Sequence, residues 1–313
     1  MRIAVFGAGG VGGYFGGRLA QAGQDVVFIA RGDHLTTLRQ HGLAVTSPLG
    51  DFQVEHVEAT DDPSAVGPAD VVMLAVKTWQ IGEAAAAIAP LLGPETFVVP
   101  LLNGVEATGQ LAASLGDGRV FKGMCKIISR IDGPGKIHHV GAEPYLAFGE
   151  ADGEPSARGT VFRDVLREAG VRADTPPDMD VVLWDKFMFV VSVGGVGAVT
   201  RAPIGVIRTE PETRVMLRGA MEEIATVARA RSVALPDDVV DKALAFADTL
   251  PPQGSASLAR DIIEGRPSEL DAWTGAVVRL GAESGVPTPM HEFIYTSLLP
   301  LERRARGTLT FPE

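Results

Sequence analysis

The sequence predicts an α/β protein, with an N-terminal Rossmann-type doubly wound parallel sheet and an all-helical C-terminal domain. A strand, a glycine-rich turn and an apolar helix open the chain within residues 1–31. Strand-like and helical runs then alternate, which is typical of a parallel sheet covered by helices, and from Met179 onward every run is helical. Because 313 residues exceed what one core usually organises, we expect two domains, residues 1–175 and 176–313.

The first residues have the pattern of a dinucleotide-binding motif. A buried strand is expected at Arg2–Phe6, an apolar helix after it and a second strand at Val26–Ile29. Gly7 permits the tight turn, Gly9 lets the backbone approach a pyrophosphate, and Gly12 lets the helix pack closely on the strand. The N-terminus of the helix offers N–H groups and a positive dipole end to that pyrophosphate. Glycines used only for packing are the competing interpretation. The predicted cofactor-binding turn is Gly7-Ala8-Gly9-Gly10-Val11-Gly12.

The end of the second strand indicates which dinucleotide is bound. An Asp or Glu about twenty residues after the glycines binds the ribose 2′-hydroxyl of NAD, whereas an Arg accommodates the 2′-phosphate of NADP. The first side chain beyond the strand is Arg31, which favours NADPH. Asp33 follows two residues later, so the sequence leaves NADH open as the alternative.

Two further buried strands extend the predicted sheet, at Ala69–Val76 and Thr96–Leu102. Ligands of such sheets bind beyond the carboxyl ends of the strands, and Lys77 and Asn103 directly follow these two. We therefore expect both residues near the cofactor. Three later segments are predicted as sheet-edge strands that close the first domain: Val120–Ser129, Lys136–His139 and Tyr145–Phe148.

Composition excludes several classes of function. A net charge of −11 argues against nucleic acid or an anionic membrane as the main partner. The single cysteine, Cys125, excludes an internal disulfide framework and a cysteine-rich metal site, and it fits a reducing, cytoplasmic compartment. His138 and His139 have no third ligand at a recognisable spacing, so no metal site is predicted. The apolar stretch 181–199 contains Asp185 and is expected to be a core helix rather than a membrane span.

In the helical domain, Lys186 is the candidate proton donor. Hydride arriving at a carbonyl carbon leaves negative charge on the oxygen, so an acid or cation must lie within reach. A partly buried lysine has a lowered pKa and can serve, although a helix lysine paired with a carboxylate is the competing interpretation. Glu269 could orient the substrate or the lysine, but an acid in the first turn of a helix capped by Ser268 explains it as well. Ser257 is expected first to cap a helix.

One helix start is signalled by a capping box. Thr209 with Glu212 three residues later predicts a helix N-terminus, with Thr209 as the N-cap. The helix that follows is expected to place Val215, Ile224 and Ala228 on one buried face.

These motifs resemble those of the ketopantoate reductase family (2-dehydropantoate 2-reductases), in order and over nearly the whole chain. The resemblance implies NADPH-dependent reduction of 2-dehydropantoate to pantoate in pantothenate biosynthesis. It implies that Lys186 is the general acid and that Glu269 positions the lysine and the substrate. It further implies that Arg31 binds the 2′-phosphate, that Lys77 lies near the cofactor, that Asn103 lies between cofactor and substrate, and that Ser257 binds the substrate carboxylate. The matching segments are the glycine turn, Ile29–Arg31, Val76–Gln80, Leu102–Val105, Pro134–Gly141, Leu183–Lys186 and Ser257–Asp271.

The chain departs from the family pattern at two positions. The family carries asparagines four and eight residues after its lysine, where this sequence has Val190 and Gly194. A site without these hydrogen bonds could prefer a more apolar 2-oxo acid or ketone. A non-catalytic NADP-binding sensor is the third hypothesis. The presence of both Lys186 and Glu269 argues against it, since a sensor needs no proton donor. The expected partner is a small 2-oxo acid, and the apolar helices are compatible with a homodimer.

Overall fold

The computed structural model describes residues 1–312, which form two compact units. Unit 1 consists of residues 1–102 and 106–179. Unit 2 begins at Asp180 and also includes the short segment Asn103–Val105. The chain therefore enters the helical unit briefly before it completes the α/β unit.

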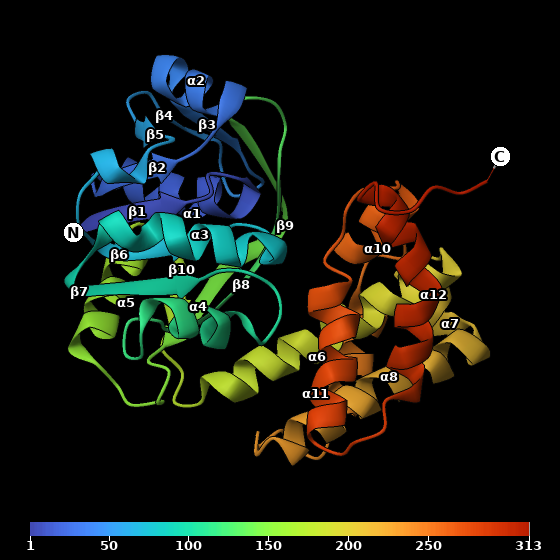
Figure 1. Cartoon of the computed structure of the whole chain (residues 1–313). Helices are drawn as coiled ribbons and strands as arrows, with labels where there is room; N and C mark the ends of the chain where they lie inside the picture. The colour runs from blue at the N-terminus through green and yellow to red at the C-terminus, as the bar shows by residue number, and fades with distance from the viewer. Residues whose placement is uncertain (313) are drawn as a thin grey trace. The chain divides into compact units, whose positions relative to one another are not determined.

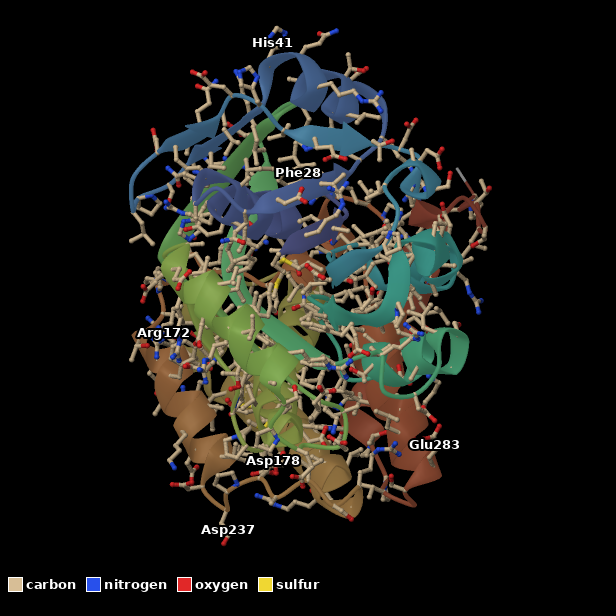
Figure 2. The ribbon with its side chains drawn as sticks, turned by 90° about the vertical axis from the view of Figure 1, so that its left-hand side faces the viewer. Phe28, His41, Arg172, Asp178, Asp237 and Glu283 are labelled. Carbon is tan, nitrogen blue, oxygen red and sulfur yellow. The ribbon has the colours of Figure 1, made fainter. Side chains whose placement is uncertain are left out.

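A five-stranded parallel sheet forms the centre of unit 1, in the order β5-β2-β1-β6-β7 (Figure 1). Side chains of β1 alternate between its faces: Ile3 and Val5 lie in the core with α1, and Ala4 and Phe6 lie in the core with α3 and α4. Helices on both faces confirm the predicted doubly wound sheet. On β2, Phe28 is fully buried (Figure 2). The strands are β1 (Arg2–Phe6), β2 (Asp25–Ile29), β5 (Glu58–Thr60), β6 (Ala69–Leu74) and β7 (Leu92–Pro100), and the helices of unit 1 are α1 (Gly10–Gln21), α2 (Gly32–His41), α3 (Ile81–Ile88), α4 (Ala107–Leu115) and α5 (Ala157–Glu168).

Unit 1 contains a second sheet, in the order β10-β9-β3-β4, with β8 paired to β9. The segments after residue 119 were predicted to be edge strands of the first sheet. This prediction is wrong, because they form the separate second sheet. β9 pairs in parallel with β3, with Ile137 opposite Val45, and so distant a partner leaves no local sequence signal. The strands are β3 (Leu43–Thr46), β4 (Phe52–Val54), β8 (Lys122–Ile131), β9 (Lys136–Gly149) and β10 (Arg172–Asp174).

Every regular element among the described residues of unit 2 is a helix, as predicted. Its helix α6 is long and apolar enough to cross a membrane, but 67% of that stretch is buried inside the protein. This burial is that of a core helix, which agrees with the sequence interpretation. The elements are α6 (Met179–Thr200), α7 (Ile204–Thr209), α8 (Pro211–Ala230), α9 (Val239–Thr249), α10 (Ser257–Ile263), a π-helical turn η4 (Asp271–Gly275), α11 (Ala276–Glu283) and α12 (Pro289–Ala305).

The predicted N-cap of the long helix α8 is wrong by one residue, because Glu210 and not Thr209 occupies that position. Thr209 ends α7 and donates its hydroxyl to the Gly205 carbonyl at 2.8 Å, so it does not cap α8. Pro211 occupies the first position of α8, where its fixed φ and missing N–H are tolerated best. Ile224 is buried as expected, whereas the Val215 side chain is 70% exposed.

Candidate active site

The glycine turn between β1 and α1 has the shape that a dinucleotide requires. Gly7 has φ +101°, and a Cβ there would lie 2.7 Å from the Ala75 carbonyl oxygen. A Cβ on Gly12 would lie 2.1 Å from the Gly7 oxygen, so only glycine fits. Around Gly9, in contrast, the space is open for 4 Å. Since the first N–H groups of a helix have no intrahelical partner, the turn fits a pyrophosphate placed over Gly9.

The other predicted cofactor residues of unit 1 follow the same ends of the strands. Arg31 is the N-cap of α2, and its guanidinium forms a 2.6 Å ion pair with Glu83 in which both side chains are mostly exposed. Such a surface pair contributes about 0–1 kcal/mol, so a 2′-phosphate could replace Glu83 at small cost. Lys77 caps the turn after β6, with its ammonium 5.8 Å from the Trp79 ring centre. β1 and β6 are the strands between which the sheet order reverses, where ligands of this fold bind.

In unit 2, the structure brings Lys186 and Asn103 into direct contact. The Lys186 Nζ donates a hydrogen bond to Asn103 Oδ1 at 2.8 Å. Lys186 lies two turns into α6 and is partly buried. The neighbour of Asn103, Gly104, has φ +107° and lies beside η4, where a Cβ would be 3.4 Å from the Ala272 carbonyl oxygen. The two residues, 83 positions apart, form one polar pair.

Glu269 is only 6% exposed and lies just before η4. The predicted helix cap at Ser268 is wrong: the helical turn starts at Asp271, and the Ser268 hydroxyl donates instead to Glu302 Oε2 at 2.5 Å. The Ser268 N–H donates to both Glu302 oxygens, at 3.1 and 3.0 Å. Arg306 donates to Glu302 Oε1 at 2.5 Å and to the Ser268 carbonyl at 2.8 Å. The end of α12 thus clamps the residue that precedes Glu269.

Ser257 is partly buried and is the first residue of α10 rather than its N-cap. The next residue, Leu258, packs on α6 at the position where the family pattern has its second asparagine. A Cβ on Gly194 would lie 3.3 Å from Leu258 Cβ and 3.0 Å from Trp273 Cζ3. Trp273 is 2% exposed, and it fills the space that a side chain at 194 would need. Val190, one turn nearer to Lys186, is partly buried against the same apolar core.

Trp273 and Glu302 were not singled out from the sequence. A tryptophan within an apolar helical run gives no local sign of which residue it meets. Glu302 with Arg306 has the spacing of an ordinary surface ion pair on a helix. The buried indole Nε1 of Trp273 makes no hydrogen bond within the described chain, and a buried donor of this kind costs free energy until water or a ligand binds it.

The second of the two histidines of β9, His139, is held by contacts within unit 1. The ring nitrogens of His139 lie 2.9 Å from the Ser47 hydroxyl and 3.1 Å from the Ala142 carbonyl. Across residues 1–312 there is no cluster of three or more His, Cys, Asp or Glu side chains that could hold a metal ion.

Comparison with known proteins matches both units. The family model "Ketopantoate reductase PanE/ApbA" matches residues 3–153, and its C-terminal counterpart matches residues 178–302. A 2-dehydropantoate 2-reductase of Mesorhizobium japonicum is 31% identical, with 92% of this chain and 94% of that protein aligned. The uncharacterized oxidoreductase YkpB of Bacillus subtilis is 30% identical over 95% of this chain and 98% of its own. A crystal structure of a PanE/ApbA family ketopantoate reductase from Ralstonia eutropha superposes with a TM-score of 0.89 at 34% identity, covering 98% of this chain and all of that one.

Proposed function

Because the chain belongs to the ketopantoate reductase family, we propose that it reduces the keto group of a small 2-oxo acid with NADPH, with 2-dehydropantoate as the first candidate substrate and pantoate as its product. The family consists of NADPH-dependent oxidoreductases acting on a C=O/CH–OH pair. The observation that carries the proposal is the 2.8 Å hydrogen bond between Lys186 and Asn103. A proton donor held in one orientation is useful for catalysis and has no purpose in a protein that only senses NADP. A cytoplasmic location and a role in pantothenate biosynthesis would follow from this activity.

The chain's own residues supply the steps other than hydride transfer. NADPH, bound at Gly7–Gly12, Arg31 and Lys77, would supply the hydride to the keto carbon. The Lys186 ammonium donates one of its hydrogen bonds to Asn103 Oδ1. As the keto oxygen gains negative charge, Lys186 donates a proton to it, and Asn103 fixes the direction from which that proton comes.

Two further residues would orient the lysine and the substrate. Glu269, which follows the clamped residue Ser268, would use its carboxylate to orient the Lys186 ammonium. Ser257, at the start of α10, would donate its hydroxyl to the substrate carboxylate. The contacts Gly104–Ala272 and Gly194–Leu258 support this assignment, since they join the elements that carry Asn103, Lys186, Glu269 and Ser257.

A second candidate is the reduction of a more apolar 2-oxo acid. Val190 offers methyl groups instead of an amide, and the Trp273 ring occupies the space beside Gly194. A hydroxylated substrate would lose two hydrogen bonds at these positions, and a hydrocarbon side chain would lose none.

A substrate panel at fixed NADPH tests the proposal, followed by the loss of NADPH absorbance. A kcat/KM of at least about 10⁴ M⁻¹s⁻¹ with 2-dehydropantoate would support the first candidate, and a clear preference for branched or aromatic 2-oxo acids the second. Lys186→Ala should lower kcat by about 10²- to 10⁴-fold. Lys242→Ala, at an exposed lysine of α9 that pairs with Asp238, is the matched control and should be unchanged. NADPH binding without turnover of any 2-oxo acid would refute both candidates and favour the sensor.

A further inference from the structure

We propose that His34 is a positioning residue for the cofactor, because it ties the glycine turn, helix α2 and the β8–β9 turn together. This inference rests on the proposed binding of NADPH by Gly7–Gly12 and Arg31. It assigns to His34 the task of holding these two phosphate-binding places at a fixed separation.

Both ring nitrogens of His34 are used, and they reach different parts of unit 1. The Nε2 lies 2.8 Å from the Ala8 carbonyl oxygen, in the middle of the glycine turn. The Nδ1 accepts a hydrogen bond from the Gly135 N–H at 3.1 Å, in the turn between β8 and β9. Since an N–H can only donate, Nδ1 must be unprotonated, and Nε2 must carry the proton that it donates to Ala8. His34 is therefore neutral here, and burial lowers its pKa while the bond to Ala8 opposes that shift.

The hydrogen bond to Ala8 fixes a donor that the pyrophosphate needs. The Ala8 carbonyl and the Gly9 N–H belong to one planar trans peptide and point in opposite directions. Holding the carbonyl therefore also holds the Gly9 N–H, at the residue over which the space is open. The preceding residue is anchored as well, because the Gly7 N–H donates to Ile29 at 3.1 Å.

The same ring also fixes the start of α2. Arg31 is the N-cap of α2 and His34 lies in its first turn, so a restraint on one restrains the other. One turn further along, Thr37 packs on Gly135: a Cβ added to Gly135 would come within 2.6 Å of Thr37 Cγ2. Arg31 and Gly9 are thus connected through a single imidazole, which keeps a fixed distance between the residues proposed to bind the 2′-phosphate and those proposed to bind the pyrophosphate.

Two substitutions separate this role from general stabilisation. His34→Phe keeps a flat ring and removes both hydrogen bonds, whereas His34→Gln keeps one donor and one acceptor without a charge. His41→Gln is the matched control, since His41 is an exposed histidine at the far end of the same helix (Figure 2). The measurements are the Kd for NADPH by titration calorimetry, kcat and substrate KM at saturating NADPH, and the thermal midpoint without cofactor.

We expect His34→Phe to raise the Kd for NADPH about tenfold, equivalent to about 1.4 kcal/mol, with kcat and substrate KM within about threefold of wild type. His34→Gln should restore the Kd to within about threefold, and His41→Gln should leave it unchanged. A Kd for His34→Phe within about twofold of wild type, or a Gln variant no better than Phe, would overturn the proposal. If wild type itself does not bind NADPH, the proposed function fails instead.

A measurement on the unmodified protein covers the case in which His34→Phe does not fold. Nitrogen-15 NMR of the histidine rings distinguishes the two neutral tautomers. The Nε2–H form at His34 supports the proposal, and the Nδ1–H form or a charged ring at neutral pH overturns it.

Discussion

Gly194→Ala tests whether Trp273 closes the space beside α6. Within a helix, replacing Gly by Ala normally stabilises a protein by about 0.5–1 kcal/mol. At Gly194, however, the new Cβ would lie 3.0 Å from Trp273 Cζ3 and 3.3 Å from Leu258 Cβ, closer than ordinary contacts. Overpacking of this kind costs about 1–3 kcal/mol. The sum predicts a net loss of about 1 kcal/mol in the free energy of unfolding.

Gly219→Ala is the matched control, because Gly219 lies inside α8 of the same unit. A Cβ there would meet only Met290 Cε, at 3.6 Å, which is an ordinary contact. This variant should gain about 0.5–1 kcal/mol, so the two substitutions should differ by about 2 kcal/mol. Urea unfolding followed by tryptophan emission suits the comparison, since Trp184 and Trp273 are both buried in unit 2.

Equal stabilisation by Gly194→Ala and Gly219→Ala would refute this reasoning. It would mean that Trp273 moves aside at no cost and that an asparagine at 194 could be accommodated. The structural support for an apolar substrate would then be lost, and 2-dehydropantoate would be the stronger candidate.

Three further predictions concern the cofactor, pH and the clamp. Arg31→Ala should weaken NADPH binding about 10- to 100-fold and NADH binding less than about twofold, because charge-assisted hydrogen bonds to the 2′-phosphate are worth about 1.5–3 kcal/mol. The control Glu83→Gln releases Arg31 from its ion pair and should not weaken NADPH binding. Equal losses of affinity for both cofactors in Arg31→Ala would contradict the assignment of Arg31 to the 2′-phosphate. Burial lowers the pKa of His139, so its contribution to stability is present above about pH 6.5 and is lost as the pH falls through the lower pKa of the folded state. The thermal midpoint should therefore fall between pH 7 and pH 5, and it should fall less steeply in His139→Asn. Equal dependence of the thermal midpoint on pH in both proteins would argue against this role of His139. Glu302→Gln removes the charge from the hydrogen bonds between Glu302 and Ser268, and it should lower the free energy of unfolding in urea by about 2 kcal/mol. A change below about 0.5 kcal/mol would show that these hydrogen bonds contribute little to stability.

The parts of the fold that sequence reasoning predicted are those set by local sterics. Gly12 is required by its close approach to the Gly7 carbonyl within one βαβ unit, so the motif could be identified without the structure. The second sheet depends on β3 pairing with β9, which no local pattern encodes. Likewise, Ser268 lies in a sequence pattern typical of a helix N-cap. Its hydroxyl and its N–H instead donate hydrogen bonds to Glu302, 34 residues later.

In the candidate site, too, residues with a local sequence signal could be predicted and residues that depend on distant contacts could not. Asn103 was singled out because it directly follows a predicted strand, and Lys186 because it is a lysine within an otherwise apolar helix. The hydrogen bond between them joins residues 83 positions apart and was not predicted. His34 and Trp273 were missed because their importance comes from what they touch: a carbonyl in another turn and a glycine on another helix. Their residue types alone gave no signal.

The placement of Asn103–Val105 in unit 2 has a consequence for how these proteins can be recombined. Joining the helical unit to a different α/β unit at residue 180 would deliver Lys186 without its hydrogen-bond partner. A working chimera must therefore also carry the segment Asn103–Val105 from the connection between β7 and α4. Evolution faces the same constraint, so the two halves of such an enzyme should be inherited together rather than exchanged as separate modules.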